Sequence, residues 1–167
     1  MVARDQPKSS SIGSMSAPVD DRNAAAATAL GAGREALHVD ALHMLALVAP
    51  PDQALDAHHT ALTWARASED PAARDWDASV LNNIGMHHAD AEDWGAALAA
   101  FEDALAARER IGDPDRTRVA KWMVGWALRN LGHTEAALRL QKELKAELEA
   151  AGHEDPYVDE ELALLQG

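Results

Sequence analysis

The chain has 167 residues, no cysteine and a formal net charge of −13 at pH 7, from 28 acidic and 15 basic side chains. A disulfide framework and cysteine-based zinc sites are therefore excluded, and so acidic a chain opposes binding to nucleic acid, whose phosphates need clustered lysine and arginine. Aromatic residues make up only 4% of a chain rich in alanine and leucine, which predicts an all-α fold.

The N-terminal stretch, 1–19, mixes serine, proline, glycine and isolated charges without helical periodicity, and predicts a disordered tail ahead of a helical domain over 20–167. It has no apolar run that would serve as the core of a signal peptide. No segment reaches the roughly 18 apolar residues of a membrane span. We therefore expect no membrane contact and a cytoplasmic location.

An alanine-rich helix is predicted from Asp20 or Asp21 to about Leu30, and Gly31-Ala32-Gly33 is expected to break it. Three helix pairs are predicted after it, separated by proline, by an aspartate N-cap at Asp93, or by glycine at a C-cap position. They cover 34–48 with 54–67, 79–90 with 94–110, and 116–131 with 134–151.

The last stretch, 157–166, is predicted to be a C-terminal helix that caps the array. Its apolar residues are expected to cover the last exposed face, and its acidic ones to meet water. The apolar set is Val158, Leu162 and Leu165, and the acidic set is Asp159, Glu160 and Glu161. An equally consistent interpretation is the first helix of a further repeat.

The middle pair recurs along the chain. Gly85 and Ala97 are small where two helices would cross, and Phe101 is large enough to fill the space toward the next pair. Forty residues on, Gly125 and Ala137 take the places of Gly85 and Ala97. A more divergent copy of the pair precedes the one that contains Gly85. The three repeats therefore cover about 34–71, 77–114 and 116–156.

This order of small and aromatic residues resembles the tetratricopeptide repeat (TPR), in the longer variety found in kinesin-light-chain-like repeats, since the period exceeds about 34 residues. The resemblance implies a right-handed superhelix, an α-solenoid of about three helix-turn-helix repeats. It also implies a non-catalytic scaffold or adaptor whose concave groove binds a protein or peptide, without a cofactor.

In such a superhelix the first helix of each pair lines the groove. Trp122 and Trp126 give their helix a second apolar side, which is typical of anchors for a bound partner, and Arg129 beside them is suited to a carboxylate. The groove candidates are His43, Asn82, Asn83, Met86, Trp122, Trp126 and Arg129. The full set of groove positions is Ala36, Val39, His43 and Ala46, then Ser79, Asn82, Met86 and Ala89, then Val119, Trp122, Trp126 and Arg129.

Two other functions remain open. The Trp122 and Trp126 face suits a homodimer seam, which would make the chain a self-associating structural module. The histidines at 58–59 and 87–88 are expected on neighbouring helices, where imidazoles bind metal or respond to pH. His58 and His88 each stand where a core aromatic is usual, however, so we expect no metal site. No phosphate loop, G-x-S-x-G motif or paired catalytic carboxylates are found, and no enzyme is predicted.

Overall fold

The computed structural model describes the backbone of residues 19–167 and the side chains of 31 and 33–167. In this part of the chain every regular element is a helix, which confirms the all-α class. Residues 1–18 of the predicted tail lie outside these limits, and so do the side chains of the proposed N-caps at 20 and 21, although the backbone is already helical from Val19. The helices are α1 (Val19–Leu47), α2 (Pro51–Ala67), α3 (Pro71–Arg74), α4 (Asp77–Asp90), α5 (Trp94–Ile111), α6 (Pro114–Asn130), α7 (Thr134–Ala150) and α8 (Pro156–Gln166).

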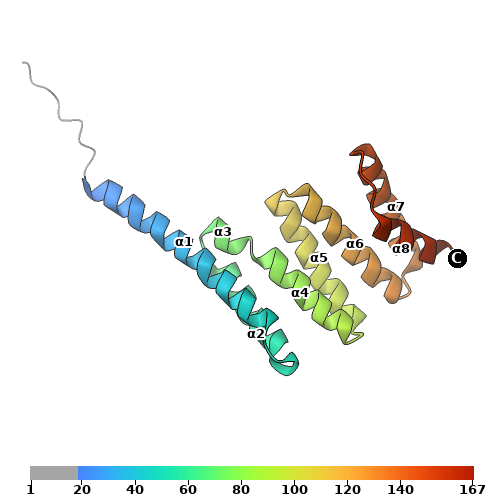
Figure 1. Ribbon diagram of the computed structural model, residues 1–167, viewed down its shortest axis with the longest axis horizontal. Coiled ribbons are helices and arrows are strands. Elements are labelled where there is room, and N and C mark those ends of the chain that lie inside the picture. Colours follow the sequence, from blue (N-terminus) through green and yellow to red (C-terminus); the bar gives the residue numbers. More distant parts are fainter. Residues whose placement is uncertain (1–18) are drawn as a thin grey trace, which may run out of the picture.

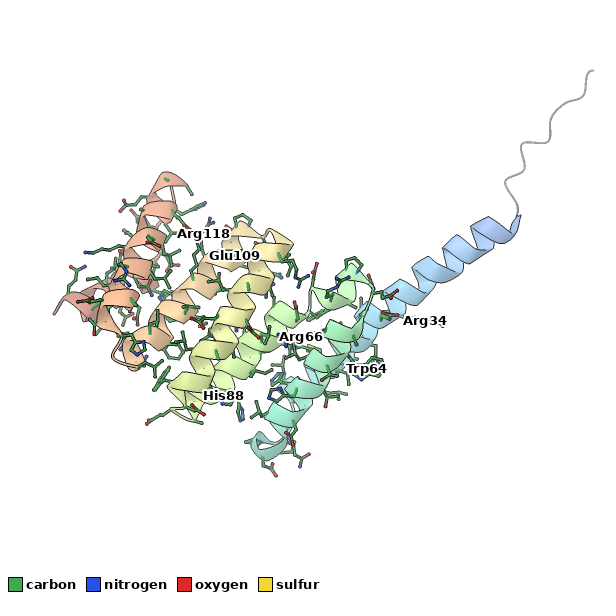
Figure 2. All side chains as sticks on the ribbon, turned by 180° about the vertical axis from the view of Figure 1, so that it is seen from behind. Arg34, Trp64, Arg66, His88, Glu109 and Arg118 are labelled. Carbon is green, nitrogen blue, oxygen red and sulfur yellow. The ribbon has the colours of Figure 1, made fainter. Side chains whose placement is uncertain are left out.

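The helices pack in sequential pairs. α1 lies against α2, α4 against α5 and α6 against α7, and each pair packs on the next (Figure 1). The short α3 fills the connection between the first two pairs, and α8 closes the far end against α7. Figure 2 shows the array from behind, with Arg34 and Trp64 at the α1–α2 end and Arg118 on α6. The arrangement is the predicted array of helix pairs.

Helix α1 differs from the prediction because it runs without a break through Gly31-Ala32-Gly33. Nothing lies within 4 Å of where a Cβ would stand on Gly31 or Gly33, so neither glycine is required by close packing. A glycine inside a helix costs only about 1 kcal/mol relative to alanine. The good helix formers on both sides outweigh that cost.

Aspartates cap the starts of four of the helices, α3, α5, α6 and α8. The Asp93 carboxylate accepts a hydrogen bond from the backbone N–H of Ala96 at the start of α5, as predicted. An Asp-Pro step does the same at the starts of α3, α6 and α8, where the carboxylates of Asp70, Asp113 and Asp155 each accept a backbone N–H. Each step sets a carboxylate at the cap and a proline at the first helical position, where its missing N–H is not needed.

Glycines at equivalent positions allow the paired helices to approach closely. A Cβ on Gly85 would lie 2.4 Å from the ring of Phe101, and a Cβ on Gly125 would lie 2.4 Å from the amide of Gln141. Both partner side chains are fully buried. Residues 40 positions apart in the sequence therefore also make equivalent contacts in the structure, and Gln141 takes the place of Phe101.

Helix α8 covers the end of the array as expected. Val158 is fully buried and packs with Leu144 and Leu148 of α7 and with Trp122 of α6. Glu161 differs from its prediction, because it is 4% exposed rather than in water. It lies three residues after Val158, which places both side chains on one side of the helix. Within residues 19–167 no helix is long and apolar enough to cross a membrane.

Candidate functional site

The groove positions predicted on the first repeat face the core. Val39 and Ala46 are each 1% exposed and His43 is 7% exposed. The His43 ring lies 5.2 Å from the Trp76 ring, between centroids, and 6.0 Å from the His58 ring. This side of α1 packs on α2 and α3, so these positions offer a partner no surface.

Trp126 and Met86 contribute to the core between the second and third pairs. The Trp126 ring packs edge-on against Trp94, at 4.8 Å between centroids, and lies 6.3 Å from Phe101. Met86 packs on the same cluster. These side chains hold α6 against α4 and α5. Asn83 is half-buried on α4 and lines none of the cavities described below.

Trp122 is held in place by contacts on two sides. Its ring stacks on Trp126 at 5.8 Å between centroids with 14° between the planes. Its indole N–H donates a hydrogen bond of 3.1 Å to the carbonyl oxygen of Tyr157, at the start of α8. The indole therefore has a fixed orientation, with part of its surface still accessible.

Arg129 pairs with a carboxylate of its own chain. Its Nε and Nη2 donate hydrogen bonds of 2.7 and 2.8 Å to the two carboxylate oxygens of Glu161. Those bonds raise the pKa of the Arg129 guanidinium. Arg129 was predicted to suit a carboxylate, and α8 of the same chain supplies that carboxylate. Position 161 faces α6, whereas the prediction placed it in water.

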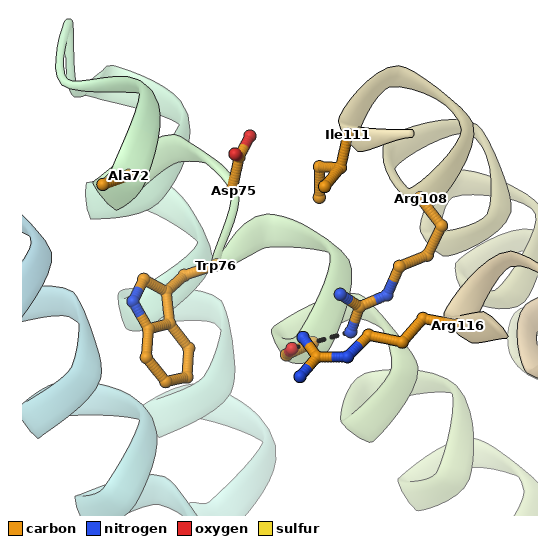
Figure 3. A pocket seen from close by; sticks show the side chains of 7 residues that line it. Ala72, Asp75, Trp76, Arg108, Ile111 and Arg116 are labelled. Carbon is orange, nitrogen blue, oxygen red and sulfur yellow. Dashed lines mark hydrogen bonds between the residues drawn. The ribbon is translucent and has the colours of Figure 1, made fainter. Parts of the chain in front are cut away.

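Three cavities that share lining residues follow one another between α4, the C-terminal half of α5 and α6, from the end at α3 to the start of α8, and we call this row the inner groove. The first has a volume of about 200 Å³, the second about 190 Å³ and the third about 360 Å³. The first two share Arg108 and Arg116, and the last two share Val119. The first is lined by Ala72, Asp75, Trp76, Ser79, Arg108, Ile111 and Arg116 (Figure 3). The second is lined by Ala78, Asn82, Ala104, Arg108, Arg116, Val119 and Ala120. The third is lined by Val119, Trp122, Met123, Asp155 and Tyr157.

The two ends of the inner groove differ in chemistry. The third cavity is mostly apolar, and Val119 and Tyr157 at its rim are 53% and 66% exposed. At the other end, Nη2 of Arg108 donates a 2.8 Å hydrogen bond to the Ser79 hydroxyl. Burial, and then the neighbouring charge of Arg116, lower the pKa of Arg108.

Four of the expected groove positions line the inner groove: Ser79, Asn82, Val119 and Trp122. The sequence reasoning missed Arg108, Arg116 and Tyr157, because they come from helix ends and from α8. One signal for Arg108 was present in the sequence. No acidic residue lies three or four positions from it, so it has no ion-pair partner on its own helix.

The histidines form a small buried group. The Nδ1 atoms of His43 and His58 are buried without a hydrogen-bond partner, and burial lowers the pKa of both rings. His88 is only partly buried, with its Nδ1 3.9 Å from a carboxylate oxygen of Asp93. Among the described residues, no three acidic or histidine side chains gather in a way that would hold a metal ion.

Comparison with protein families gives one match. The model of the tetratricopeptide repeat family matches residues 76–146, which include α4, α5, α6 and most of α7. The matched segment contains both glycine contacts and most of the inner groove. No curated protein is significantly similar to the chain.

Proposed function

Since residues 76–146 belong to the tetratricopeptide repeat family, we propose that the chain is a non-catalytic module that binds a segment of another protein along the inner groove. Repeats of this family generally mediate protein–protein interactions. The proposal extends that general role to one surface. That surface runs along the first helices of the second and third pairs, α4 and α6, and ends at α8.

The observation that carries the proposal is the continuity of the three cavities. They adjoin through shared side chains, so their combined length suits an extended segment rather than a single small molecule. Their walls belong to helices that pack on one another, so the groove exists before a partner arrives. Preformed sites lose less conformational entropy on binding, which favours affinity.

Trp122 is the proposed anchor. Its orientation is set by the stacked Trp126 ring and by the hydrogen bond to Tyr157. Val119 and Met123 extend the apolar surface beside it. An apolar side chain placed there leaves water, and buried aromatic contacts of this kind dominate many interfaces. Asn82, in the second cavity, is placed to bond the backbone of the bound segment.

A matched pair of valine substitutions tests the proposal. Val119→Glu places a carboxylate in the inner groove, whereas Val48→Glu places one at an exposed position just after α1, at 76% exposure. Tagged wild-type protein and both variants are incubated with lysate of the source organism, and bound proteins are quantified by mass spectrometry. We expect Val119→Glu to lose partners that Val48→Glu retains. Equal retention by the two variants would contradict the proposal.

The homodimer alternative has weaker support, because Trp122 and Trp126 contact each other and their own chain's α5 and α8. It remains testable by sedimentation over a range of concentrations. The cytoplasmic location is likewise a proposal, for which fractionation of the source cells is the test.

A further inference from the structure

Helix α1 has a second apolar side, directed away from the core. Val39 and Ala46 are buried against the rest of the chain. On the opposite side, Leu37 and Met44 of α1 and Val48 just after it are each more than half exposed. Figure 1 shows α1 at the outer edge of the array. A helix that is apolar on two sides normally packs on both.

The exposed apolar side chains of the described residues are concentrated on this side of the molecule. Of nine large apolar residues that are exposed, five lie on α1 or directly after it, and a sixth, Trp64, lies on α2. The Trp64 ring meets the His38 ring edge-on, at 4.6 Å between centroids, so it flanks α1 (Figure 2). Monomeric proteins rarely expose contiguous apolar patches larger than roughly a few hundred Å². We call this patch the outer face, and it consists of Leu37, Ala41, Met44, Leu45, Val48 and Trp64.

The spacing along the outer face is that of a coiled-coil seam. Arg34, Leu37, Ala41, Met44 and Val48 follow one another at steps of three and four residues, and all five are exposed. This alternation keeps one line of side chains facing a second helix. The outer face therefore suits another helix rather than an extended peptide.

We propose that the outer face binds the outer face of a second copy of the chain, so that two α1 helices pair in antiparallel orientation around a twofold axis. In this pairing Leu37 faces Val48 of the second copy, and Ala41 faces Met44. Each contact occurs twice because the interface is symmetric. A small residue opposite a large one lets the two helices approach closely.

The charges at the seam favour the antiparallel orientation. Parallel pairing would place the two Arg34 side chains next to each other, and like charges repel. Antiparallel pairing separates them and brings each Arg34 to the start of the second copy's α2, where Asp52 is exposed. His38 and Leu45 flank the seam on one side, so Trp64, beside His38, comes to lie against Leu45 of the second copy.

The available area is sufficient for a dimer. Specific interfaces bury about 1,200–2,000 Å² in total. The seam from Arg34 to Val48 spans about four helical turns on each copy, and Trp64 adds to it, which places the pairing at the lower end of that range. We expect a dissociation constant of about 1 μM. The inner groove lies on α4 and α6, so this inference does not depend on the proposed function.

Sedimentation equilibrium over a wide range of concentrations measures the association. We expect the wild-type chain to approach twice its mass of 17.9 kDa as the concentration rises. Leu37→Glu should stay monomeric, since it places two carboxylates in an apolar seam. Leu164→Glu on α8 is the matched control, because Leu164 is 58% exposed and Leu37 68%, and it should associate as wild type does. Urea unfolding checks that both variants fold.

Cysteine pairs test the antiparallel orientation, and the chain has no cysteine of its own. The two Leu37 residues of the proposed dimer stand about 16 Å apart along the helix axis, whereas a disulfide needs Cα atoms within about 7 Å. An oxidised mixture of Leu37→Cys and Val48→Cys chains should therefore crosslink, and neither variant alone should. Crosslinking of each variant with itself would show parallel pairing and overturn the proposed arrangement.

A chain that stays monomeric at every concentration would overturn the dimer. If Leu37→Cys in such a monomer also resisted a thiol reagent, the chain's own N-terminal segment would be the occupant of the outer face. A Leu37→Glu variant that still dimerised would place the contact elsewhere, for example at Trp122.

None of these results affects the inner groove, because each groove is complete within one chain. Val48→Glu should be monomeric and should still retain the partners of the inner groove. A photo-crosslink from Val48 to a second copy gives a product of twice the chain mass, which distinguishes it from a captured partner protein.

Discussion

The carboxylate of Glu161 accepts two hydrogen bonds from the guanidinium of Arg129, at 2.7 and 2.8 Å. The bond joins α8 to α6 across 32 residues of chain. Beside it, Val158 packs into the apolar cluster of α7, and the indole of Trp122 bonds to the backbone of Tyr157. Helix α8 therefore both covers α7 and α6 and forms one wall of the inner groove.

Glu161→Gln should destabilise the chain, because it removes a buried negative charge and leaves Arg129 without its partner. We expect a loss of about 1–3 kcal/mol in the free energy of unfolding, measured by urea denaturation. Asp159→Asn is the matched control. Asp159 lies on the same helix as Glu161, and the substitution breaks its 2.7 Å ion pair with Lys145 of α7. The Asp159 carboxylate is 53% exposed, so the loss should stay below about 1 kcal/mol. Similar losses for the two variants would show that Glu161 does not hold α8.

The two close glycines should respond differently to alanine. Gly85→Ala places a methyl group against the Phe101 ring, which is fully buried and cannot move aside. Overpacking of this kind costs about 1–3 kcal/mol or more. Gly125→Ala meets the amide end of Gln141, which is equally buried but has more rotatable bonds than Phe101, so we expect a smaller cost. Gly33→Ala, with open space around it, should be neutral or stabilising by up to about 1 kcal/mol.

Thermal and urea unfolding of these three variants provide the measurement. The expected order of stability is Gly33→Ala, then Gly125→Ala, then Gly85→Ala. Adding Phe101→Leu to Gly85→Ala should recover part of the loss, because the smaller side chain leaves space for the methyl group. An unperturbed Gly85→Ala variant would mean that α4 and α5 do not approach as closely as described.

Stability should fall on mild acidification because of the two buried histidines. Burial lowers the pKa of His43 and of His58 from about 6.5 in the folded chain, and neighbouring histidines lower that of His58 further. Below pH 6.5 the unfolded chain therefore binds protons that the folded chain does not, and the free energy of unfolding decreases. Well above pH 6.5 both rings are neutral in both states, so this contribution is constant there.

The measurement is the free energy of unfolding between pH 7.5 and 5.5, above the range in which ordinary carboxylates titrate. His58→Leu should show a shallower decrease than wild type, and His153→Gln, at an exposed position, should show the wild-type decrease. A wild-type decrease unchanged in His58→Leu would mean that this ring does not cause it.

The sequence predicted the parts of the fold that depend on periodic spacing. Apolar periodicity and the recurrence of Gly85 at Gly125 identified the helix pairs, and the cap at Asp93 was confirmed. The prediction missed that α1 is unbroken. It considered only the poor helix propensity of the two glycines and not the strong helix propensity of the residues on both sides. The buried Glu161 was missed because its environment depends on how α8 docks on α6, and the spacing within a single helix does not encode that.

The candidate site was predictable only in part, for a related reason. Positions on the first helices of the second and third pairs, such as Asn82 and Trp122, lie where helical geometry expects them. The first repeat departs from that expectation, since the His43 ring faces His58 of α2 and Trp76, just before α4. The two arginines of the inner groove come from two helix ends that only the packing of α5 against α6 brings together.

Site-directed photo-crosslinking tests the central claim, that the inner groove is the surface that holds a partner. A photoreactive phenylalanine analogue is placed at Val119, in the groove, or at Val48, which is exposed just after α1, and each protein is irradiated in lysate of the source organism. The account predicts a crosslinked partner at Val119, lost on competition with unmodified protein, and none at Val48. Crosslinks at Val48 alone, or equal crosslinks at both positions, would contradict it.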